Sequence, residues 1–291
     1  MLSPICLFTY NRLSETQQTV EALKANILAS ESKLFIFSDG AKAGGNAQNV
    51  INVRNYLKTI TGFKSVEIVE SETNKGLANS IIHGVTKIIN QFGKVIVLED
   101  DLITTPNFLN FMNQSLDFYD SNNKIFSVTG YSMDLPSLKS ASIDFFYSYR
   151  ASSWGWGTWK NRWNVIDWQM TDYSTFKWDV KAQLRFMRGG SDLPYMLWKQ
   201  MHGKIDSWAI RWCYNQFKNN LLTVYPAKSK VINIGIGVAA THTKKTKRFF
   251  VLPDQECKVN FKFEDEIELN DQLIKEFKSK FSVIARLNDR F

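Results

Sequence analysis

The sequence predicts an α/β protein with a mostly parallel central sheet and helices on both faces. Over the first hundred residues, short apolar stretches alternate with amphipathic ones, in an order that reads as strand, helix, strand, helix, strand, helix, strand. This alternation is typical of parallel sheets whose crossover helices cover both faces. The chain has 291 residues, of which 44% are hydrophobic and 22% charged, as in ordinary globular proteins. Its length suits one large α/β domain or two small ones.

Four strands are expected because four short apolar runs are bounded by polar or turn-forming residues. They are Pro4–Thr9, Lys33–Ser38, Val66–Val69 and Val95–Leu98. Three helices are expected between them because apolar residues recur at intervals of three and four. These helices carry Val20, Leu23 and Ile27, then Val50, Val53, Leu57 and Ile60, then Leu77, Ile81, Val85, Ile88 and Phe92. Ser14 and Gln17 have the spacing of a capping box at the start of the first helix.

Polar residues follow each expected strand at its carboxyl end, the edge of a parallel sheet where ligands bind. They are Tyr10-Asn11-Arg12, Ser38-Asp39-Gly40, Asn74-Lys75-Gly76 and Glu99-Asp100-Asp101. Neither the G-x-G-x-x-G pattern of dinucleotide-binding proteins nor a P-loop follows the first strand. If a nucleotide binds at this edge, its phosphates must be held in another way.

The three acids from Glu99 to Asp101 stand at the end of a strand expected to be buried. Adjacent carboxylates repel one another, and burial makes that repulsion costly. A Mg²⁺ or Mn²⁺ ion removes this cost, because both ions prefer hard oxygen ligands and can clamp a diphosphate. The alternative is a solvated acidic turn that leads into the next helix, for which Thr105 would be the N-cap and Pro106 the first residue.

The net charge of +8 favours anionic partners, although an ordinary soluble basic protein can carry it as well. Nucleic-acid binding would explain the charge but not the acids at a strand end, so no nucleic-acid partner is expected. Three cysteines without C-x-x-C spacing fit a reducing cytoplasm and indicate neither a disulfide framework nor a metal cage. The sequence indicates neither a signal peptide nor an apolar run long enough to cross a bilayer.

The strand that ends in Glu99-Asp100-Asp101-Leu102, followed by Pro106 and an aromatic-rich helix, resembles the metal-binding motif of GT-A glycosyltransferases. The likeness is greatest to N-acetylglucosaminyltransferase I and its bacterial relatives. Further stretches resemble that family in the same order over about residues 3 to 250, although their spacing differs from that of the animal enzyme. They are Tyr10-Asn11-Arg12, Ser38-Asp39-Gly40, Phe126–Gly130, Trp154–Gly157, Asp206-Ser207-Trp208 and Ile234–His242.

The resemblance implies a GT-A, Rossmann-like fold and a set of roles around a metal and a nucleotide. Asp101 would be the direct metal ligand, Asp100 would contact the ribose or metal-bound water, and His242 would bind metal or a phosphate oxygen. Tyr10 and Arg12 would face the nucleotide. Ordinary alternatives are a surface salt bridge for Arg12 and a structural role for His242.

Two further residues are expected near the nucleotide. The resemblance implies that Asp39 contacts uracil, while the alternative is an ordinary Asp-Gly turn. Lys75 lies at the start of the third helix, where backbone N–H groups favour an anion. A plain helix start explains Lys75 equally well.

The resemblance also implies sites for sugars. Glu99 would bind donor-sugar hydroxyl groups. Trp154, Gly155 and Trp156 would form a loop beside the sugar, since indole faces stack on flat apolar surfaces and glycine permits a close approach. Trp159 and Trp163 follow closely and bring the tryptophans of this region to four. The alternative is that some of the four are core residues, which is expected of Trp159 and Trp163.

Asp206 matches the family's segment that carries the catalytic base. An inverting transfer needs one base to accept the proton of the acceptor hydroxyl. The alternative role is an N-cap of the next helical stretch, Trp208 to Phe217. Other candidate bases are Asp134, Asp167, Asp172 and Asp192.

A basic run made of Lys244, Lys245, Lys247 and Arg248 precedes Phe249 and Phe250. It fits a lid that closes over a diphosphate, contact with an anionic membrane surface, or a solvated loop.

Together these features predict a metal-dependent, inverting glycosyltransferase that uses Mn²⁺ or Mg²⁺ and a nucleotide-diphosphate sugar, most simply a UDP-sugar. The acceptor would be a glycan or a lipid-linked glycan of bacterial surface polysaccharide synthesis, and the protein would be cytoplasmic, with peripheral contact with the inner face of the membrane. Residues 1–254 would form the GT-A domain, with a nucleotide-binding half (1–102) and an acceptor and catalytic half (103–254). Residues 255–291 would be a C-terminal appendage.

Two alternatives to a transferase remain open at this point. A sugar nucleotidyltransferase could use the same sheet and acids, but it would usually need a glycine- and lysine-rich loop after the first strand. A non-catalytic sugar-binding scaffold of the same fold would not need Asp101 and Asp206 together.

Overall fold

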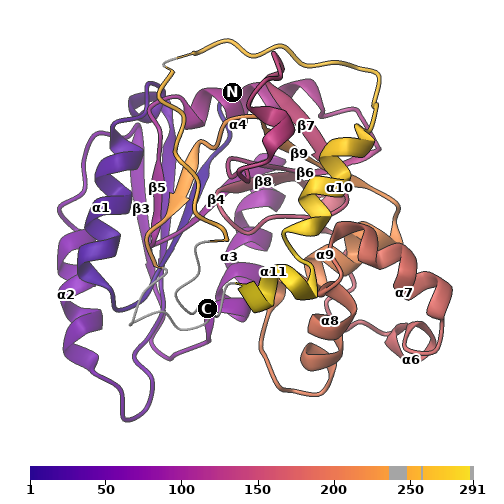
Figure 1. Cartoon of the computed structure of the whole chain (residues 1–291). Helices are drawn as coiled ribbons and strands as arrows, with labels where there is room; N and C mark the ends of the chain where they lie inside the picture. The colour runs from indigo at the N-terminus through magenta and orange to yellow at the C-terminus, as the bar shows by residue number, and fades with distance from the viewer. Residues whose placement is uncertain (236–247, 257, 289–291) are drawn as a thin grey trace.

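The computed structural model of the chain describes residues 1–235, 248–256 and 258–288. These residues form an eight-stranded sheet in the order β3-β2-β1-β4-β8-β6-β9-β7, with helices on both faces (Figure 1). A second sheet of two strands pairs β10 with β5 in antiparallel fashion. The predicted α/β class with a mostly parallel sheet is confirmed, because six strands of the large sheet share one direction and only β7 and β8 oppose it.

The first half of the chain has the predicted alternation of strands and helices. Its elements are β1 (Ile5–Thr9), α1 (Leu13–Lys24), β2 (Lys33–Ser38), α2 (Ala47–Leu57), β3 (Ser65–Glu70), α3 (Leu77–Phe92) and β4 (Lys94–Glu99). The chain passes from β1 outward to β2 and β3, then returns to place β4 on the other side of β1. This reversal opens a crevice at the carboxyl ends of β1 and β4, where ligands of such sheets bind.

The second half of the chain extends the sheet and covers it. Its elements are β5 (Leu102–Thr104), α4 (Phe108–Phe118), β6 (Ile125–Thr129), β7 (Phe145–Ser148), β8 (Trp156–Trp159), α5 (Lys160–Trp163), α6 (Tyr173–Phe176), α7 (Val180–Phe186), α8 (Leu193–Met201), α9 (Trp208–Lys218), β9 (Leu222–Pro226), β10 (Val231–Asn233), α10 (Asp271–Ser279) and α11 (Val283–Asn288). Strand β6 covers most of the stretch Phe126–Gly130, and helix α9 confirms the helical stretch expected from Trp208 to Phe217.

Closely packed tryptophan rings fill the core between the sheet and α9. The ring centroid of Trp156 lies 5.7 Å from that of Trp163 and 5.0 Å from those of Trp208 and Trp212. Trp159, the other buried indole of β8, donates its Nε1–H to the carbonyl oxygen of Leu116 over 2.9 Å. The predicted core positions of Trp159 and Trp163 are confirmed.

Three details of the helix ends differ from the sequence prediction. Ser14 lies inside the first turn of α1, whose N-cap is Arg12, so the predicted capping box does not form. The Arg12 carbonyl instead accepts hydrogen bonds from the backbone N–H and the hydroxyl of Thr16. Ile27 lies beyond the end of α1 and is half-exposed. Helix α4 begins after Asn107, beyond the predicted start at Thr105, because the Thr105 hydroxyl donates to the side chain of Asn107.

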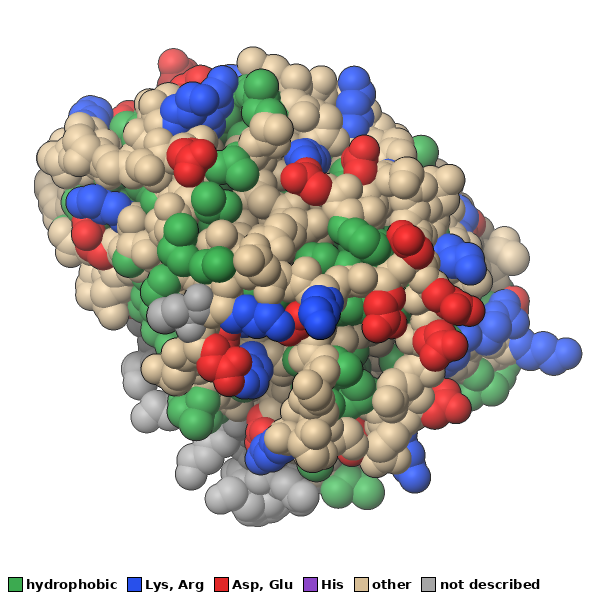
Figure 2. All heavy atoms as spheres, turned by 90° about the horizontal axis from the view of Figure 1, so that it is seen from above, with side chains coloured by type: hydrophobic (Ala, Val, Ile, Leu, Met, Phe, Trp, Pro, Cys, Tyr) green, Lys and Arg blue, Asp and Glu red, His purple; other side chains and the backbone are tan. Residues whose placement is uncertain are grey.

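The segment after residue 254, expected to be an appendage, packs along the main body of the protein. Asp254 forms a buried ion pair with Lys230, and Asn107 donates to the same carboxylate over 3.0 Å. The Phe261 ring meets Phe111 edge-on with centroids 5.1 Å apart. Residues on both sides of position 254 therefore contribute to one packed structure. The face of this structure seen from above carries interspersed acidic and basic side chains (Figure 2).

Helix α10 continues this packing at the outer end of the sheet. Its Phe277 ring meets Tyr225 of β9 edge-on with centroids 5.3 Å apart, and Leu273 is buried beside them. Among the described residues, no helix combines the length and the apolar character needed to cross a bilayer.

Candidate functional site

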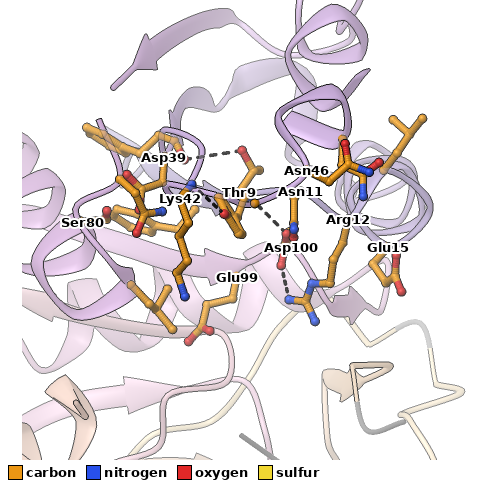
Figure 3. A pocket seen from close by; sticks show the side chains of 18 of the residues that line it. Thr9, Asn11, Arg12, Glu15, Asp39, Lys42, Asn46, Ser80, Glu99 and Asp100 are labelled. Carbon is orange, nitrogen blue, oxygen red and sulfur yellow. Dashed lines mark hydrogen bonds and ion pairs between the residues drawn. The ribbon is translucent and has the colours of Figure 1, made fainter. Parts of the chain in front are cut away.

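A pocket of about 810 Å³ opens at the carboxyl ends of β1, β2 and β4, where the strand order reverses (Figure 3). Its walls come from residues 8–15 at the end of β1 and beyond it, Asp39 after β2, the start of α3, and Glu99 and Asp100 at the end of β4. Small-molecule and cofactor sites typically occupy a few hundred to about a thousand Å³. The structure therefore brings Tyr10, Arg12, Asp39, Glu99 and Asp100 together around a space large enough for a nucleotide.

Arg12 bridges two of the three acids at the end of β4. One guanidinium nitrogen forms a close ion pair with Asp100 and lies 3.1 Å from Oδ2 of Asp101, and Figure 3 shows Arg12 and Asp100 pointing toward each other. The backbone N–H of Tyr10 also donates to Asp100 over 3.4 Å. The salt bridge considered for Arg12 thus exists, but it lies in the wall of the pocket and balances part of the cluster's charge.

Arg12 compensates only part of the cost of ionising Glu99 and Asp100. Burial raises the pKa of Glu99 to about 8, and repulsion from Asp101 and Asp100 adds to this shift. Burial also raises the pKa of Asp100 to about 6, although the charge of Arg12 opposes the change. A cation beside these oxygens would favour their ionised forms, so the cluster has the electrostatics of a cation-binding site.

The donor atoms of the cluster suit a hard divalent cation. Asp100 and Asp101 offer only carboxylate oxygens, the ligands that Mg²⁺ and Mn²⁺ prefer. Asp101 lies just outside the pocket lining, where its Oδ1 accepts a 3.4 Å hydrogen bond from Asn233 at the end of β10. In the described ranges, no group of three or more His, Cys, Asp or Glu side chains is arranged to hold a metal. Substrate phosphates and water would thus complete the coordination, as Mg²⁺ sites commonly allow. His242 lies outside the described residues.

Asp39 organises the loops at the pocket floor. Its carboxylate accepts hydrogen bonds from the backbone N–H groups of Gly40, Lys75 and Gly76 and from the side chain of Asn74, at 2.9 to 3.1 Å. Four bonds fill the usual acceptor capacity of a carboxylate. The structure therefore supports a loop-fixing role for Asp39 over the expected hydrogen bond to uracil.

The start of α3 reaches the pocket without the side chain of Lys75. Lys75 is exposed and does not line the pocket, whereas Gly76, Leu77 and Ser80 do. Gly76 is the N-cap and has a φ of 76°, a left-handed conformation that glycine adopts at little cost. This geometry supports the plain helix start considered for Lys75.

The expected sugar platform at residues 154–156 is not part of the pocket. Trp156 is fully buried in the tryptophan core, so the prediction that its ring faces a sugar is wrong. Gly155 backs onto Phe108 and Val231, where an added Cβ would lie 2.8 to 3.1 Å from their side chains. Trp154 is partly buried and meets Tyr131 edge-on with centroids 4.5 Å apart. A Trp-rich stretch fills this core because stacked indoles bury large apolar areas.

Asp206 lies at the rim of the pocket, beside the start of α3. Its Oδ2 is 4.0 Å from the point that a Cβ on Gly76 would occupy, and Gly76 lines the pocket. Its side chain is 63% exposed, with a long 3.4 Å ion pair to Arg211. The N-cap of α9 is Ser207, so the helix-capping role considered for Asp206 belongs to its neighbour.

The four rival aspartates are engaged away from the described pocket lining. Asp134 pairs with Lys139, and Asp172 pairs with Lys218. Asp167 fixes the loop that follows it, and Asp192 is buried against Arg150. Asp206 is thus the best-placed of the proposed bases.

A polar wall of the pocket, supplied by α2 and the loop before it, was not predicted from the sequence. Lys42, Asn46, Asn49 and Asn52 line the pocket, and Lys42 points toward the side on which Glu99 lies (Figure 3). Asn46 is also the N-cap of α2 and accepts from the N–H of Gln48 over 3.1 Å. The asparagine spacing of three was visible in the sequence, and it could have indicated a polar helix face next to the β2 loop.

A partly buried arginine behind this wall was not predicted either. Arg54 of α2 donates to the carbonyl oxygens of Ser38, Asp39 and Ser71 over 2.7 to 3.3 Å. It also pairs with Glu70 over 3.3 Å. Arg54 thus ties the ends of β2 and β3 together beneath the pocket.

Comparison of the chain with known proteins found distant likenesses among solved structures. No protein-family model matches the chain, and no curated protein matches it significantly. Among solved structures, TarS 1-349 from S. aureus is 10% identical over 81% of this chain and 61% of its own, with a TM-score of 0.44. A second TarS structure from S. aureus is 16% identical over 44% of this chain and 21% of its own, with a TM-score of 0.30.

A third likeness is the mannosyltransferase PcManGT from Pyrobaculum calidifontis, solved in complex with GDP-Man and Mn²⁺. It is 8% identical over 55% of this chain and 46% of its own, with a TM-score of 0.38. This chain thus spans less than two thirds of the length of each of the three structures. Identities and TM-scores this low assign neither a family nor an activity.

Proposed function

We propose that this protein is a glycosyltransferase that binds a nucleotide-diphosphate sugar with a divalent cation. The observation that carries the proposal is the pocket at the strand reversal. Arg12, Glu99 and Asp100 line one wall of this pocket, and the pKa values of both acids are raised. The carboxylate of Asp206 lies at the rim of this pocket, away from the loops that Asp39 fixes at its floor. The resemblance of the E-D-D-L segment and of the Asp206 segment to GT-A glycosyltransferases supports the same proposal.

The walls of the pocket suit the separate parts of such a donor. The asparagine side chains at 46, 49 and 52 present amide donors and acceptors that fit the edges of a base or ribose. Arg12 and Lys42 supply positive charge for phosphates. Glu99, which also lines the pocket, would accept hydrogen bonds from sugar hydroxyl groups once ionised. A uridine nucleotide is the donor we propose.

Asp100 and Asp101 would hold Mn²⁺ or Mg²⁺, which neutralises charge that develops on the leaving diphosphate. Arg12 adds positive charge on the same side of the pocket. Asp206 would take the proton of the acceptor hydroxyl as that oxygen bonds to the anomeric carbon and the bond from that carbon to the diphosphate oxygen breaks. Attack opposite the leaving group inverts the anomeric configuration. The acceptor we propose is a glycan or lipid-linked glycan at the cytoplasmic face of a membrane.

The test is release of nucleoside diphosphate from UDP-glucose, UDP-galactose, UDP-N-acetylglucosamine and GDP-mannose, with Mn²⁺ or with EDTA. We expect metal-dependent release from at least one donor, by hydrolysis or by transfer to an added glycan. Asp206→Asn should bind UDP as the parent does and lose release by roughly a hundredfold or more, the range of general base catalysis. Asp134→Asn, at another exposed aspartate, is the matched control and should retain release.

Either of two outcomes would contradict the proposal. Release at the parent rate by Asp206→Asn would remove Asp206 as the base. Formation of a nucleotide-sugar from a nucleoside triphosphate and a sugar phosphate, without any release from the four donors, would identify a nucleotidyltransferase instead.

A further inference from the structure

The α6–α7 hairpin exposes three large apolar side chains within residues 178–184. Trp178 is 79% exposed, Val180 67% and Leu184 61%. The hairpin lies at the edge of the molecule farthest from α1 and α2 (Figure 1). Singly exposed apolar residues are common, but three so close together form a surface that needs a physical explanation.

Two of the exposed apolar side chains, those of Val180 and Leu184, belong to the regular helix α7 and not to a loop. Ala182 and Phe186 of this helix are buried, whereas Val180 and Leu184 are exposed. At about 100° per residue, the pair at 180 and 184 lies nearly opposite the pair at 182 and 186. Helix α7 therefore has one apolar face that packs on the protein and a second that faces outward, where a surface helix normally carries polar residues.

The hairpin is fixed firmly to the body of the protein. The Phe176 ring of α6 meets Phe186 of α7 with centroids 5.8 Å apart and Tyr214 of α9 with centroids 4.9 Å apart. The Phe186 ring also lies 5.0 Å from that of Phe217. These contacts hold the outward-facing apolar side chains in place on an ordered support.

Basic side chains border the apolar ones. Lys177, Lys181 and Arg185 are exposed, and Lys177 Nζ lies 5.4 Å from the centre of the Trp178 ring. Asp179, which caps α7 through the N–H of Ala182, is the one acid among residues 177–185, and the nearby Asp172 is paired with Lys218, so the basic side chains outnumber the acidic ones. The hairpin therefore presents a positive charge beside its apolar surface.

We propose that the α6–α7 hairpin is the surface by which this protein binds an anionic lipid bilayer. Trp178, Val180 and Leu184 would enter the boundary between headgroups and acyl chains, where tryptophan is favoured. Lys177, Lys181 and Arg185 would meet anionic headgroups. A bilayer fits better than a protein partner, because the apolar side chains project from the turn before α7 and from this short helix and are bordered by basic side chains, a pattern typical of interfacial helices. The inference does not depend on the proposed transferase activity.

The test is co-sedimentation of the full chain with vesicles of phosphatidylcholine alone or mixed with phosphatidylserine. We expect binding to the mixed vesicles that weakens as salt is added, and little binding to phosphatidylcholine. Lys181→Gln with Arg185→Gln should weaken binding roughly 25-fold, at about fivefold for each basic residue near the surface. Trp178→Ser with Leu184→Ser should weaken it at least about tenfold. The exposed Lys64→Gln with Lys87→Gln, on another part of the molecule, is the charge-matched control.

Thermal unfolding of each variant shows whether it is folded, and all four side chains changed in the hairpin are exposed, so little loss is expected. The proposal is overturned if the parent does not bind phosphatidylserine vesicles. It is also overturned if the control pair weakens binding as much as the hairpin pair. A dimer that Trp178→Ser with Leu184→Ser dissociates, without any vesicle binding, would identify the hairpin as a protein interface.

Discussion

Replacing Glu99 by glutamine should stabilise the protein at neutral pH, although Glu99 lines the candidate site. Burial and the neighbouring carboxylates raise the pKa of Glu99 from an ordinary value of 4.5 to about 8. Between these two values the folded protein keeps a proton that the unfolded chain has lost, so the stability of the parent falls as the pH rises. Glutamine has the shape of the protonated acid and carries no charge at any pH.

The size of the gain follows from the shift. Each pH unit between 4.5 and 8 adds about 1.4 kcal/mol, so an unscreened charge would cost about 3 kcal/mol at pH 7. The Glu99 side chain is partly exposed, and solvent screens part of that charge. We therefore expect Glu99→Gln to raise the free energy of unfolding by about 1 to 2 kcal/mol at pH 7 and by close to zero below pH 4.5.

The assay is urea unfolding followed by circular dichroism at pH 4.5, 6, 7 and 8, with EDTA present to exclude metal binding. Glu31→Gln, at an exposed position on the surface, is the control and should track the parent at every pH. A raised pKa of Glu99 is ruled out if Glu99→Gln is no more stable than the parent at pH 8, or if its gain in the free energy of unfolding is the same at pH 4.5 and pH 8.

Three further predictions concern residues that support the pocket or the C-terminal segment. Arg12→Ala removes the cation that balances the acid cluster, so the free energy of unfolding at pH 7 should fall by roughly 3 kcal/mol. Mn²⁺ should raise the melting temperature of this variant more than that of the parent, and equal shifts in a thermal scan would contradict the cation site. Gly40→Ala should cost roughly 2 kcal/mol in urea unfolding, because the new Cβ would lie 2.5 Å from the carbonyl carbon of Thr73, and an unchanged midpoint would count against this packing. Lys230→Met should lower the free energy of unfolding by roughly 3 kcal/mol, because Asp254 would be left buried without its cationic partner. Adding Asp254→Leu should recover much of this loss. A double variant as unstable as Lys230→Met would argue against a buried ion pair.

The sequence predicted the first half of the fold well, because periodicity carries the information there. Strands β1 to β4 are short apolar runs, and α3 repeats buried residues at intervals of three and four, such as Ile81, Val85 and Ile88. The rule that ligands lie beyond the carboxyl ends of parallel strands was enough to bring Arg12 and Asp100 into one pocket.

The remaining features depend on contacts that a single sequence does not reveal. Trp154 and Trp156 stand two positions apart on the chain, yet one is partly exposed and the other is fully buried by residues of α9. Capping at Ser14 failed because the turn before α1 is set by Arg12, which is held by acids about 90 positions away. The segment around Phe261 has no helix or strand periodicity, so its packing on α4 had no local signal.

The most direct test of the central claim is calorimetric titration of the purified protein with UDP, first with Mn²⁺ and then with EDTA. We expect UDP binding that requires the metal, is lost in Asp101→Ala and is retained in Asp206→Asn. Binding of UDP at equal affinity with EDTA, or by Asp101→Ala as tightly as by the parent, would contradict a metal-dependent nucleotide site at the end of β4.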